Sequence, residues 1–202
     1  MTLPAQRRRV VVGITGASGA VYGIRTLQIC REIDDVEVHL VISRGSRSTI
    51  HAETGMSVSA VADLADVVYS NDDLGAAISS GSFTTAGMIV APCSIKTLSA
   101  IANSYADGLI SRSADVALKE RRPLVLMVRE TPLHRGHLRL LSLAADSGAV
   151  IYPPVPSFYT RPGSLDEMVD HTCRRALQQL GVTTPEMAVW RGMDAGGGFP
   201  GA

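Results

Sequence analysis

Short apolar runs rich in β-branched residues alternate along the chain with longer stretches in which apolar residues recur at helical spacing. The short runs predict buried strands at 9–14, 36–42, 88–91, 124–128 and 150–152. The longer stretches predict helices at 20–32, 44–53, 94–103, 109–121, 132–147 and 164–180. Strands and helices in this alternation indicate an α/β fold with a mainly parallel sheet and helices on both faces.

Two regions depart from the alternation. Segment 54–87 is less regular and includes the small-residue stretch 76–85, so we expect a loop over the site or a contact between subunits. After Gly181 the pattern fades, and the glycine-rich end at 192–202 has too little apolar surface to hold a fold. We therefore divide the 202 residues into a tail at 1–8, one domain at 9–181 and a tail at 182–202 whose end we expect to be disordered.

Composition narrows the classes of function. With 19 basic and 19 acidic residues, no large field draws the chain to nucleic acid or anionic membranes, and we expect neither as a partner. No apolar segment approaches the roughly 20 residues that span a bilayer. The cysteines are three in number and widely spaced, which fits neither a disulfide framework nor a zinc knuckle and favours a reducing cytoplasm.

Four polar or small-residue segments directly follow predicted strands, at 13–19, 43–46, 92–97 and 129–132. In parallel sheets such loops meet at the carboxyl ends of the strands, where ligands bind. The first, GITGASG, lets backbone N–H groups approach an anion or a flavin closely. Its glycines do not match the dinucleotide fingerprint GxGxxG, and this loop alone is equally compatible with a tight strand-to-helix turn.

The second loop, APCSIKT at 91–97, places hydroxyl groups of Ser94 and Thr97 on the first turn of a predicted helix. The helix dipole and free N–H groups favour a phosphate there, although Ser94 would also suit a plain N-cap. Cys93 allows two interpretations, an activated thiol near the helix start or a small buried residue, and the second is favoured.

Basic residues form a third cluster. Arg112 and Lys119 lie seven apart on one predicted helix and so on one face, and Arg129 ends the next strand. Cations converging beside a phosphate would stabilise its departure, but such residues are also typical of a solvated helix end.

Metal and hydrolytic sites find little support. His134 and His137 have the spacing of helical neighbours but lack an obvious third ligand, so no metal is predicted. Neither Ser18 nor Cys93 has the context of a Ser-His-Asp arrangement.

Taken together, several blocks resemble the UbiX-like flavin prenyltransferases: GITGASGAVYGIR at 13–25, APCSIKTLSAIA at 91–102, ADGLISRSADVALKERRPLVL at 106–126, RETPL at 129–133 and PPVPSFYTRP at 153–162. They span roughly residues 8 to 181 in unbroken order. The stretch 76–94 is closer to the branch found with hydroxyarylic acid decarboxylases. The resemblance implies a single-domain, Rossmann-like, flavoprotein-type fold of three layers. It also implies that the protein makes prenylated FMN from dimethylallyl phosphate and reduced FMN, without a metal, for a UbiD-type decarboxylase.

The resemblance assigns roles to individual positions. It implies FMN contacts at Ala17, Ser18, Gly19, Ser43, Ser94, Ile95, Lys96, Thr97 and Arg129. It implies contacts to dimethylallyl phosphate at Arg112, Lys119, Tyr159 and Arg175. Catalytic roles are implied for Ser18, Glu53 and Glu130. Glu53 could equally be a surface charge and Glu130 a partner for a neighbouring arginine, and the sequence does not decide which group takes the flavin proton.

The family also implies a homo-oligomer, a dodecamer, with pockets completed between subunits. The chain departs from the family pattern at two places. A tryptophan that one branch carries near residue 73 is absent, and the segment HRGHLRLLS at 134–142 differs from the usual one. Whether the donor is the monophosphate or the diphosphate stays open. Two alternatives also stay open: an FMN-binding accessory subunit of a hydroxyarylic acid decarboxylase, and a flavin-dependent cysteine decarboxylase, whose Pro-x-Met-Asn-x-x-Met-Trp signature is missing.

Overall fold

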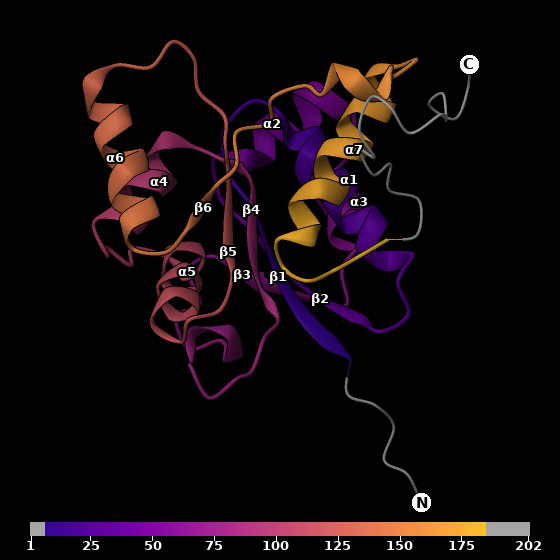
Figure 1. Ribbon diagram of the computed structural model, residues 1–202. Coiled ribbons are helices and arrows are strands. Elements are labelled where there is room, and N and C mark those ends of the chain that lie inside the picture. Colours follow the sequence, from indigo (N-terminus) through magenta and orange to yellow (C-terminus); the bar gives the residue numbers. More distant parts are fainter. Residues whose placement is uncertain (1–6, 185–202) are drawn as a thin grey trace, which may run out of the picture.

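A single parallel sheet with the strand order β3-β2-β1-β4-β5-β6 forms the centre of the molecule (Figure 1). The structure is a computed structural model that describes residues 7–184. The strands are β1 (Arg8–Ile14), β2 (Val36–Ile42), β3 (Val67–Ser70), β4 (Gly87–Cys93), β5 (Leu124–Val128) and β6 (Val150–Ile151). Every neighbouring pair is parallel, which confirms the predicted α/β fold and makes the sheet fully rather than mainly parallel.

Helices cover both faces of this sheet and make it the middle of three layers (Figure 1). One face carries α1 (Ala20–Arg31), α2 (Ser46–Thr54), α3 (Val58–Ala62) and α7 (Leu165–Gln178). The other carries the 3-10 turn η1 (Ala77–Ser79), α4 (Ile95–Ala102), α5 (Leu109–Lys119) and α6 (Arg135–Asp146). A second 3-10 turn, η2 (Phe158–Thr160), precedes α7.

The central strands are mostly apolar because both of their faces are covered. Along β1, Val10 and Val12 pack with the α1 side of the sheet, whereas Val11 packs with the α5 side. Every residue of β4 is buried. Strands enclosed in this way read as continuous hydrophobic runs rather than as an alternation of apolar and polar residues, which explains why the pattern predicted them well.

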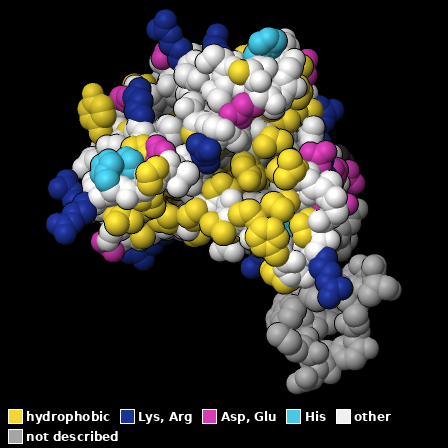
Figure 2. All heavy atoms as spheres, turned by 90° about the horizontal axis from the view of Figure 1, so that it is seen from above, with side chains coloured by type: hydrophobic (Ala, Val, Ile, Leu, Met, Phe, Trp, Pro, Cys, Tyr) yellow, Lys and Arg dark blue, Asp and Glu magenta, His cyan; other side chains and the backbone are white. Residues whose placement is uncertain are grey.

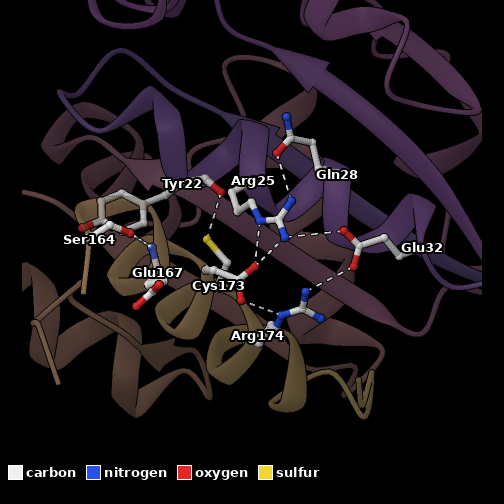
Figure 3. A network of polar contacts seen from close by, with 9 residues as sticks. Tyr22, Arg25, Gln28, Glu32, Ser164, Glu167, Cys173 and Arg174 are labelled. Atoms are coloured by element: carbon white, nitrogen blue, oxygen red, sulfur yellow. Dashed lines mark hydrogen bonds and ion pairs between the residues drawn. The ribbon is translucent and has the colours of Figure 1, made fainter. Parts of the chain in front are cut away.

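The last helix, α7, returns to the first face and packs against α1. Its contact is polar as well as apolar: Asp170 accepts hydrogen bonds from Arg25 Nε and Arg174 Nε, both at 2.7 Å (Figure 3). Glu32, directly after α1, pairs with both arginines, at 3.5 Å from Arg25 and 3.2 Å from Arg174. Two arginines and two carboxylates therefore hold these helices together.

Segment 54–87 is more ordered than its sequence suggested, since it contains α3, β3 and η1. The packed unit also extends slightly beyond both predicted boundaries: Arg8 begins β1, and the side chain of Val182 is fully buried. The predicted disorder near the C-terminus lies outside the described residues. Within 7–184, the helices are too short or too polar to cross a membrane.

The chain changes direction between two neighbouring strands. From β1 it proceeds outward through β2 to β3, then crosses back to β4 and proceeds the other way to β5 and β6. The loops after β1 and β4 therefore diverge side by side at the carboxyl edge of the sheet. Ligands of parallel α/β proteins bind at such a switch point.

Candidate functional site

A buried threonine joins the two loops at the switch point. Thr15, directly after β1, is only 1% exposed, and its Oγ1 donates to the carbonyl oxygen of Pro92 at 2.7 Å. The same Oγ1 accepts the backbone N–H of Ser94 at 2.8 Å. Because the hydroxyl group serves as donor and acceptor at once, the first and second loops hold a fixed relative position.

Two glycines let the loops after β1 and β2 approach each other. A Cβ atom at Gly16 would lie 3.0 Å from the carbonyl carbon of Gly45, which is too close for an ordinary contact. Hydrogen bonds to the carbonyl oxygen of Ile14 reinforce this approach, from the N–H of Ser43 at 2.9 Å and from Ser46 Oγ at 3.0 Å. The glycine at position 16 is therefore required by packing between backbones, whereas a Cβ atom at Gly45 would make an ordinary contact of 3.7 Å.

A cavity of about 850 Å³ lies where these loops meet the loop after β3. Its lining residues come from the carboxyl ends of four strands and from the helices that follow: Gly16, Ser43, Arg44, Gly45, Asn71, Asp72, Ser94, Lys96, Thr97, Ala100, Asp107, Ile110 and Ser111. The amino ends of α2, α4 and α5 reach this cavity. Helix amino ends carry positive partial charge and free N–H groups, so the cavity is suited to a phosphate.

The lining confirms one expectation about the second loop. Ser94 is the N-cap of α4, and its Oγ accepts the N–H of Thr97 at 3.3 Å. Both residues nevertheless line the cavity, so the cap and a ligand contact are compatible. Cys93 is fully buried and burial raises the pKa of its thiol to about 12, which makes it a core residue and not an activated thiol.

A carboxylate closes the amino end of α1. Glu53 Oε2 accepts the N–H groups of Gly19 at 2.8 Å and Ala20 at 2.9 Å. Desolvation would raise the pKa of Glu53, but hydrogen bonds from Ser18, Gly19 and Ala20, together with the charge of Arg129, outweigh it and lower the pKa. The surface-charge interpretation of Glu53 is therefore incomplete, because this side chain is part of the first loop.

Arg129 and Glu130 follow β5 beside the same loops. The N–H of Arg129 donates to the carbonyl oxygen of Cys93 at 3.2 Å, and the charge of Arg129 influences the pKa of both Glu53 and Tyr22. Glu130 is exposed, and its Oε1 accepts the N–H of Thr131 at 3.0 Å.

Four residues predicted to contact the donor phosphate fall into two groups. Tyr159 and Arg175 lie on the α7 side of the sheet, where both influence the pKa of Tyr152. The Tyr159 hydroxyl group lies 3.4 Å from His171 Nε2. These two residues therefore lie on the same side of the sheet, near Tyr152.

The other two, Arg112 and Lys119, lie on α5 on the opposite face of the sheet. Arg112 Nε donates to the carbonyl oxygen of Ser79 at 3.1 Å, and Lys119 pairs with Glu120 beside Gly81. Lys119 is the last residue of α5, and the amino end of the same helix reaches the cavity. The eleven residues of α5, about 16 Å in length, therefore separate Lys119 from the cavity. One chain does not bring the four residues together.

Histidines in the described part of the chain form no evident metal centre. The rings of His134 and His137 lie 3.7 Å apart, centroid to centroid. Within 7–184, no group of three or more His, Cys, Asp or Glu side chains is placed to hold a metal ion.

Known proteins are similar to this chain in sequence over nearly their whole length. A family described as Flavoprotein matches residues 2–162. Flavin prenyltransferase UbiX from Escherichia coli (strain K12) is 58% identical over 187 residues, covering 92% of this chain and 99% of that protein. The UbiX of Thauera aromatica is 53% identical over 184 residues, covering 91% and 94%. The chain belongs to the UbiX flavin prenyltransferases, within the flavoprotein family.

Solved UbiX structures agree with this assignment. The crystal structure of AnUbiX in complex with FMN and dimethylallyl pyrophosphate has a TM-score of 0.90 and 49% identity, covering 93% of this chain and 99% of that one. A dodecameric FMN-dependent UbiX-like decarboxylase from Escherichia coli O157:H7 has a TM-score of 0.88 and 47% identity, covering 91% and 100%.

The cavity of this UbiX-family chain collects part of the predicted FMN-binding set. Ser43, Ser94, Lys96 and Thr97 line it, whereas Ala17, Ser18 and Gly19 continue the first loop beyond Gly16. Ile95 lines a separate groove between α4 and α6.

Sequence reasoning marked the loop that contains Arg44 but assigned no individual role to a further set of lining residues: Arg44, Asn71, Asp72, Asp107, Ile110 and Ser111. The polar pair Asn71 and Asp72 follows the apolar run Val67–Tyr69. If this run had been recognised as a strand, the polar pair after it would have been predicted to lie at the site.

Proposed function

We propose that the chain transfers the dimethylallyl group of dimethylallyl phosphate to reduced FMN and so produces prenylated FMN. The observation that carries the proposal is the cavity at the switch point, where hydroxyl groups of Ser43, Ser94 and Thr97 meet the amino ends of α2, α4 and α5. Relatives named flavin prenyltransferase, at up to 58% identity over nearly their full length, support the same activity. The AnUbiX complex contains both FMN and dimethylallyl pyrophosphate.

The residues present suit FMN. The cavity of about 850 Å³ has room for a flavin nucleotide, and its hydroxyl and N–H groups match a phosphate. Ser43, Ser94 and Thr97 would hold that phosphate, while the loop at 17–19 and Arg129 would lie along the rest of the molecule. Reduced FMN would supply the electron-rich ring atoms to which the allylic carbon becomes attached.

Departure of the donor's phosphate requires cations that this chain divides between two surfaces. The bond between the allylic carbon and the phosphate oxygen breaks with its electron pair on the oxygen, and fixed cations stabilise the charge. Tyr159 and Arg175 supply one half of such a site. We propose that Arg112 and Lys119 of a neighbouring copy supply the other half, in a homo-oligomer that we take to be a dodecamer. The dodecameric relative from Escherichia coli O157:H7 supports this assembly.

A surface on the carboxyl edge favours such an assembly. Viewed from above the molecule in Figure 1, hydrophobic side chains gather in a band across this face (Figure 2). Large apolar side chains are exposed at Val155 and Phe158, before α7, and at Leu165, the first residue of α7. Apolar patches of this kind mark contacts between proteins, and a second copy of the chain would cover this one.

Proton removal after transfer requires a base beside the first loop. We propose Glu53 as this base, because its carboxylate lies against the first loop and its contacts with Ser18 and Gly19 fix its position. Ser18 would orient the carboxylate. Glu130 and the released phosphate are the other candidate acceptors of the proton. Separate substitutions of Glu53 and Glu130 compare the two carboxylates.

Flavin extracted after incubation tests the activity directly. Protein loaded with reduced FMN under anaerobic conditions is incubated with dimethylallyl phosphate or dimethylallyl diphosphate, and the extracted flavin is analysed by mass spectrometry. A flavin heavier by one five-carbon unit is expected with at least one donor and not without a donor. Unmodified flavin from FMN-loaded protein with both donors would instead favour an FMN-carrying accessory subunit.

We propose further that a UbiD-type decarboxylase receives the product and that the reaction takes place in the cytoplasm. Three free cysteines, all buried and none in a disulfide, suit a reducing compartment. Activation of purified apo-decarboxylase by product from this chain would test the first part.

A further inference from the structure

Asn71 joins the end of β3 to the beginning of α5. Its backbone carbonyl oxygen accepts the N–H of Leu109 at 2.7 Å, and its side-chain Oδ1 accepts the N–H of Ile110 at 3.1 Å. These two N–H groups belong to the first turn of α5, where no intrahelical partner exists. The N-cap residue of α5 is Gly108, which has no side chain to satisfy them. Asn71 therefore caps α5 from another element.

This cap fixes the orientation of the amide group. Because Oδ1 is taken by the N–H of Ile110, the Nδ2 atom occupies the other corner of the amide, next to Gly108. A Cβ atom at Gly108 would lie only 2.4 Å from Nδ2. The glycine at position 108 thus leaves the space that the amide occupies.

The Nδ2 group of Asn71 has N–H donors that no protein acceptor within residues 7–184 uses. Asn71 lines the cavity, and within residues 7–184 its Nδ2 makes no hydrogen bond to the protein. An amide nitrogen carries two N–H groups and no acceptor. An acceptor oxygen in the cavity is the complementary partner, and the surrounding helix amino ends favour one that is negatively charged.

We infer that Asn71 is a further FMN-binding residue, whose Nδ2 donates to the phosphate of the cofactor. The inference rests on the proposed function, since it takes FMN as the occupant of the cavity. It adds to the predicted hydroxyl groups a neutral donor from the loop after β3, a strand that the sequence pattern did not reveal.

Asn71→Asp separates the binding role from the capping role. Aspartate keeps an oxygen for the N–H of Ile110 and is as good a cap as asparagine, so α5 stays intact. It removes both Nδ2 donors and places a negative charge beside the phosphate. We expect FMN affinity to fall about tenfold or more, with no loss of thermal stability. Riboflavin, which has no phosphate, should lose much less.

Gly108→Ala reaches the same amide without changing any polar group. The φ of Gly108 is −168°, an extended conformation that alanine adopts freely. The added methyl group would crowd Nδ2 and, at 3.2 Å, the backbone carbonyl oxygen of Asn71, so the amide must move and FMN binding should weaken in the same direction. Asn103→Asp is the control for charge, because Asn103 ends α4 away from this cavity and donates to the carbonyl oxygen of Ser99. It should bind FMN as the unmodified protein does.

Titration of the intact oligomer with FMN and with riboflavin, followed by flavin fluorescence, distinguishes the outcomes. Absence of FMN binding by the unmodified protein would overturn the proposed function itself. Normal FMN binding by the unmodified protein, Asn71→Asp and Gly108→Ala alike would overturn only the role of Asn71. Equal losses for FMN and riboflavin would overturn the assignment to the phosphate. Should Asn71→Asp fail to fold, Gly108→Ala decides.

Discussion

Glu53 closes the amino end of α1 by accepting the backbone N–H of Ala20 at 2.9 Å, although Glu53 itself lies near the end of α2. The N-cap residue of α1 is Gly19, which has no side chain that could cap the helix. The cap comes instead from Glu53, on a different helix. The same carboxylate is therefore part of the structure of the first loop and a candidate base. The two roles lead to separate measurements.

The structural role predicts a pH dependence of stability. The folded protein lowers the pKa of Glu53 below the ordinary value of 4.5, so its stabilising contribution is complete above that value and disappears as the pH falls through the folded pKa. Glu53→Gln keeps an acceptor oxygen but has no charge to lose. Urea unfolding between about pH 6 and pH 3 should therefore show a steeper loss of stability for the unmodified protein than for Glu53→Gln. Identical slopes would contradict the assignment.

The proposed catalytic role predicts a different result for the same variant. Glutamine can hold the first loop but cannot take a proton, so product formation should fall strongly while FMN remains bound. Glu130→Gln is the matched comparison, because Glu130 is exposed and contacts only the N–H of Thr131 through its side chain among the described residues. A larger loss for Glu130→Gln than for Glu53→Gln would transfer the role of base to Glu130.

Thr15 offers a test of how firmly the two loops of the switch point are joined. Thr15→Val retains the shape of the side chain but leaves the N–H of Ser94 without its partner, whereas the carbonyl oxygen of Pro92 keeps the backbone N–H of Thr15 at 3.2 Å. A buried donor without a partner costs about 1–3 kcal/mol. Urea unfolding should show that loss for Thr15→Val, and Thr15→Ser, which keeps the hydroxyl group, should recover most of it. FMN should bind more weakly to the valine variant.

The proposed division of the phosphate site between two copies of the chain predicts complementation. Lys119→Ala and Tyr159→Phe should each lower product formation, because each weakens one half of the site in every copy. In oligomers assembled from both variants, some sites would combine an intact Lys119 from one copy with an intact Tyr159 from another. Mixing the variants by unfolding and refolding them together should therefore restore part of the activity. Mixtures no more active than the average of the two refolded variants would contradict a site shared between copies.

The sequence predicted five of the six strands and missed only β3, at one edge of the sheet. Strands such as β4 are buried on both faces, so their apolar runs stand out from the polar segments around them. β3 pairs with a single neighbour, spans Val67–Ser70, and alternates half-buried with exposed residues. A pattern so short resembles a loop, and with β3 the residues that follow it, Asn71 among them, were missed.

The candidate site divides in a similar way. Loops after buried strands of a parallel sheet must meet at one edge, so the sequence placed Ser43 and Ser94 together correctly. It could not place Lys119 relative to Tyr159, because helix periodicity fixes the face of a residue on its own helix and not the side of the sheet on which that helix packs. Nor could it predict that Glu53 would reach the amino end of α1, a contact that depends on how α2 packs.

The ion-pair network between α1 and α7 gives the last prediction (Figure 3). Asp170 accepts hydrogen bonds from Arg25 and from Arg174, and Arg174 is only 5% exposed, so it cannot turn to water when its partner is removed. Breaking a fully buried pair costs about 3–5 kcal/mol. Asp170 is 28% exposed and Glu32 still contacts Arg174, so Asp170→Asn should cost less, about 1–3 kcal/mol.

The sign of the pH dependence follows from the pKa of Asp170. Desolvation would raise this pKa, but hydrogen bonds from Arg174 and Arg25 outweigh it and hold the pKa below the ordinary value of 3.8. The network therefore stabilises the protein fully above that pH and loses its effect as the pH falls further. Urea unfolding at pH 7 should show the loss for Asp170→Asn, and the difference from the unmodified protein should shrink towards pH 3. Asp34→Asn changes an exposed carboxylate that makes no ion pair within residues 7–184, and should leave stability nearly unchanged. Equal effects of the two variants would mean that the network contributes no more than an isolated surface charge.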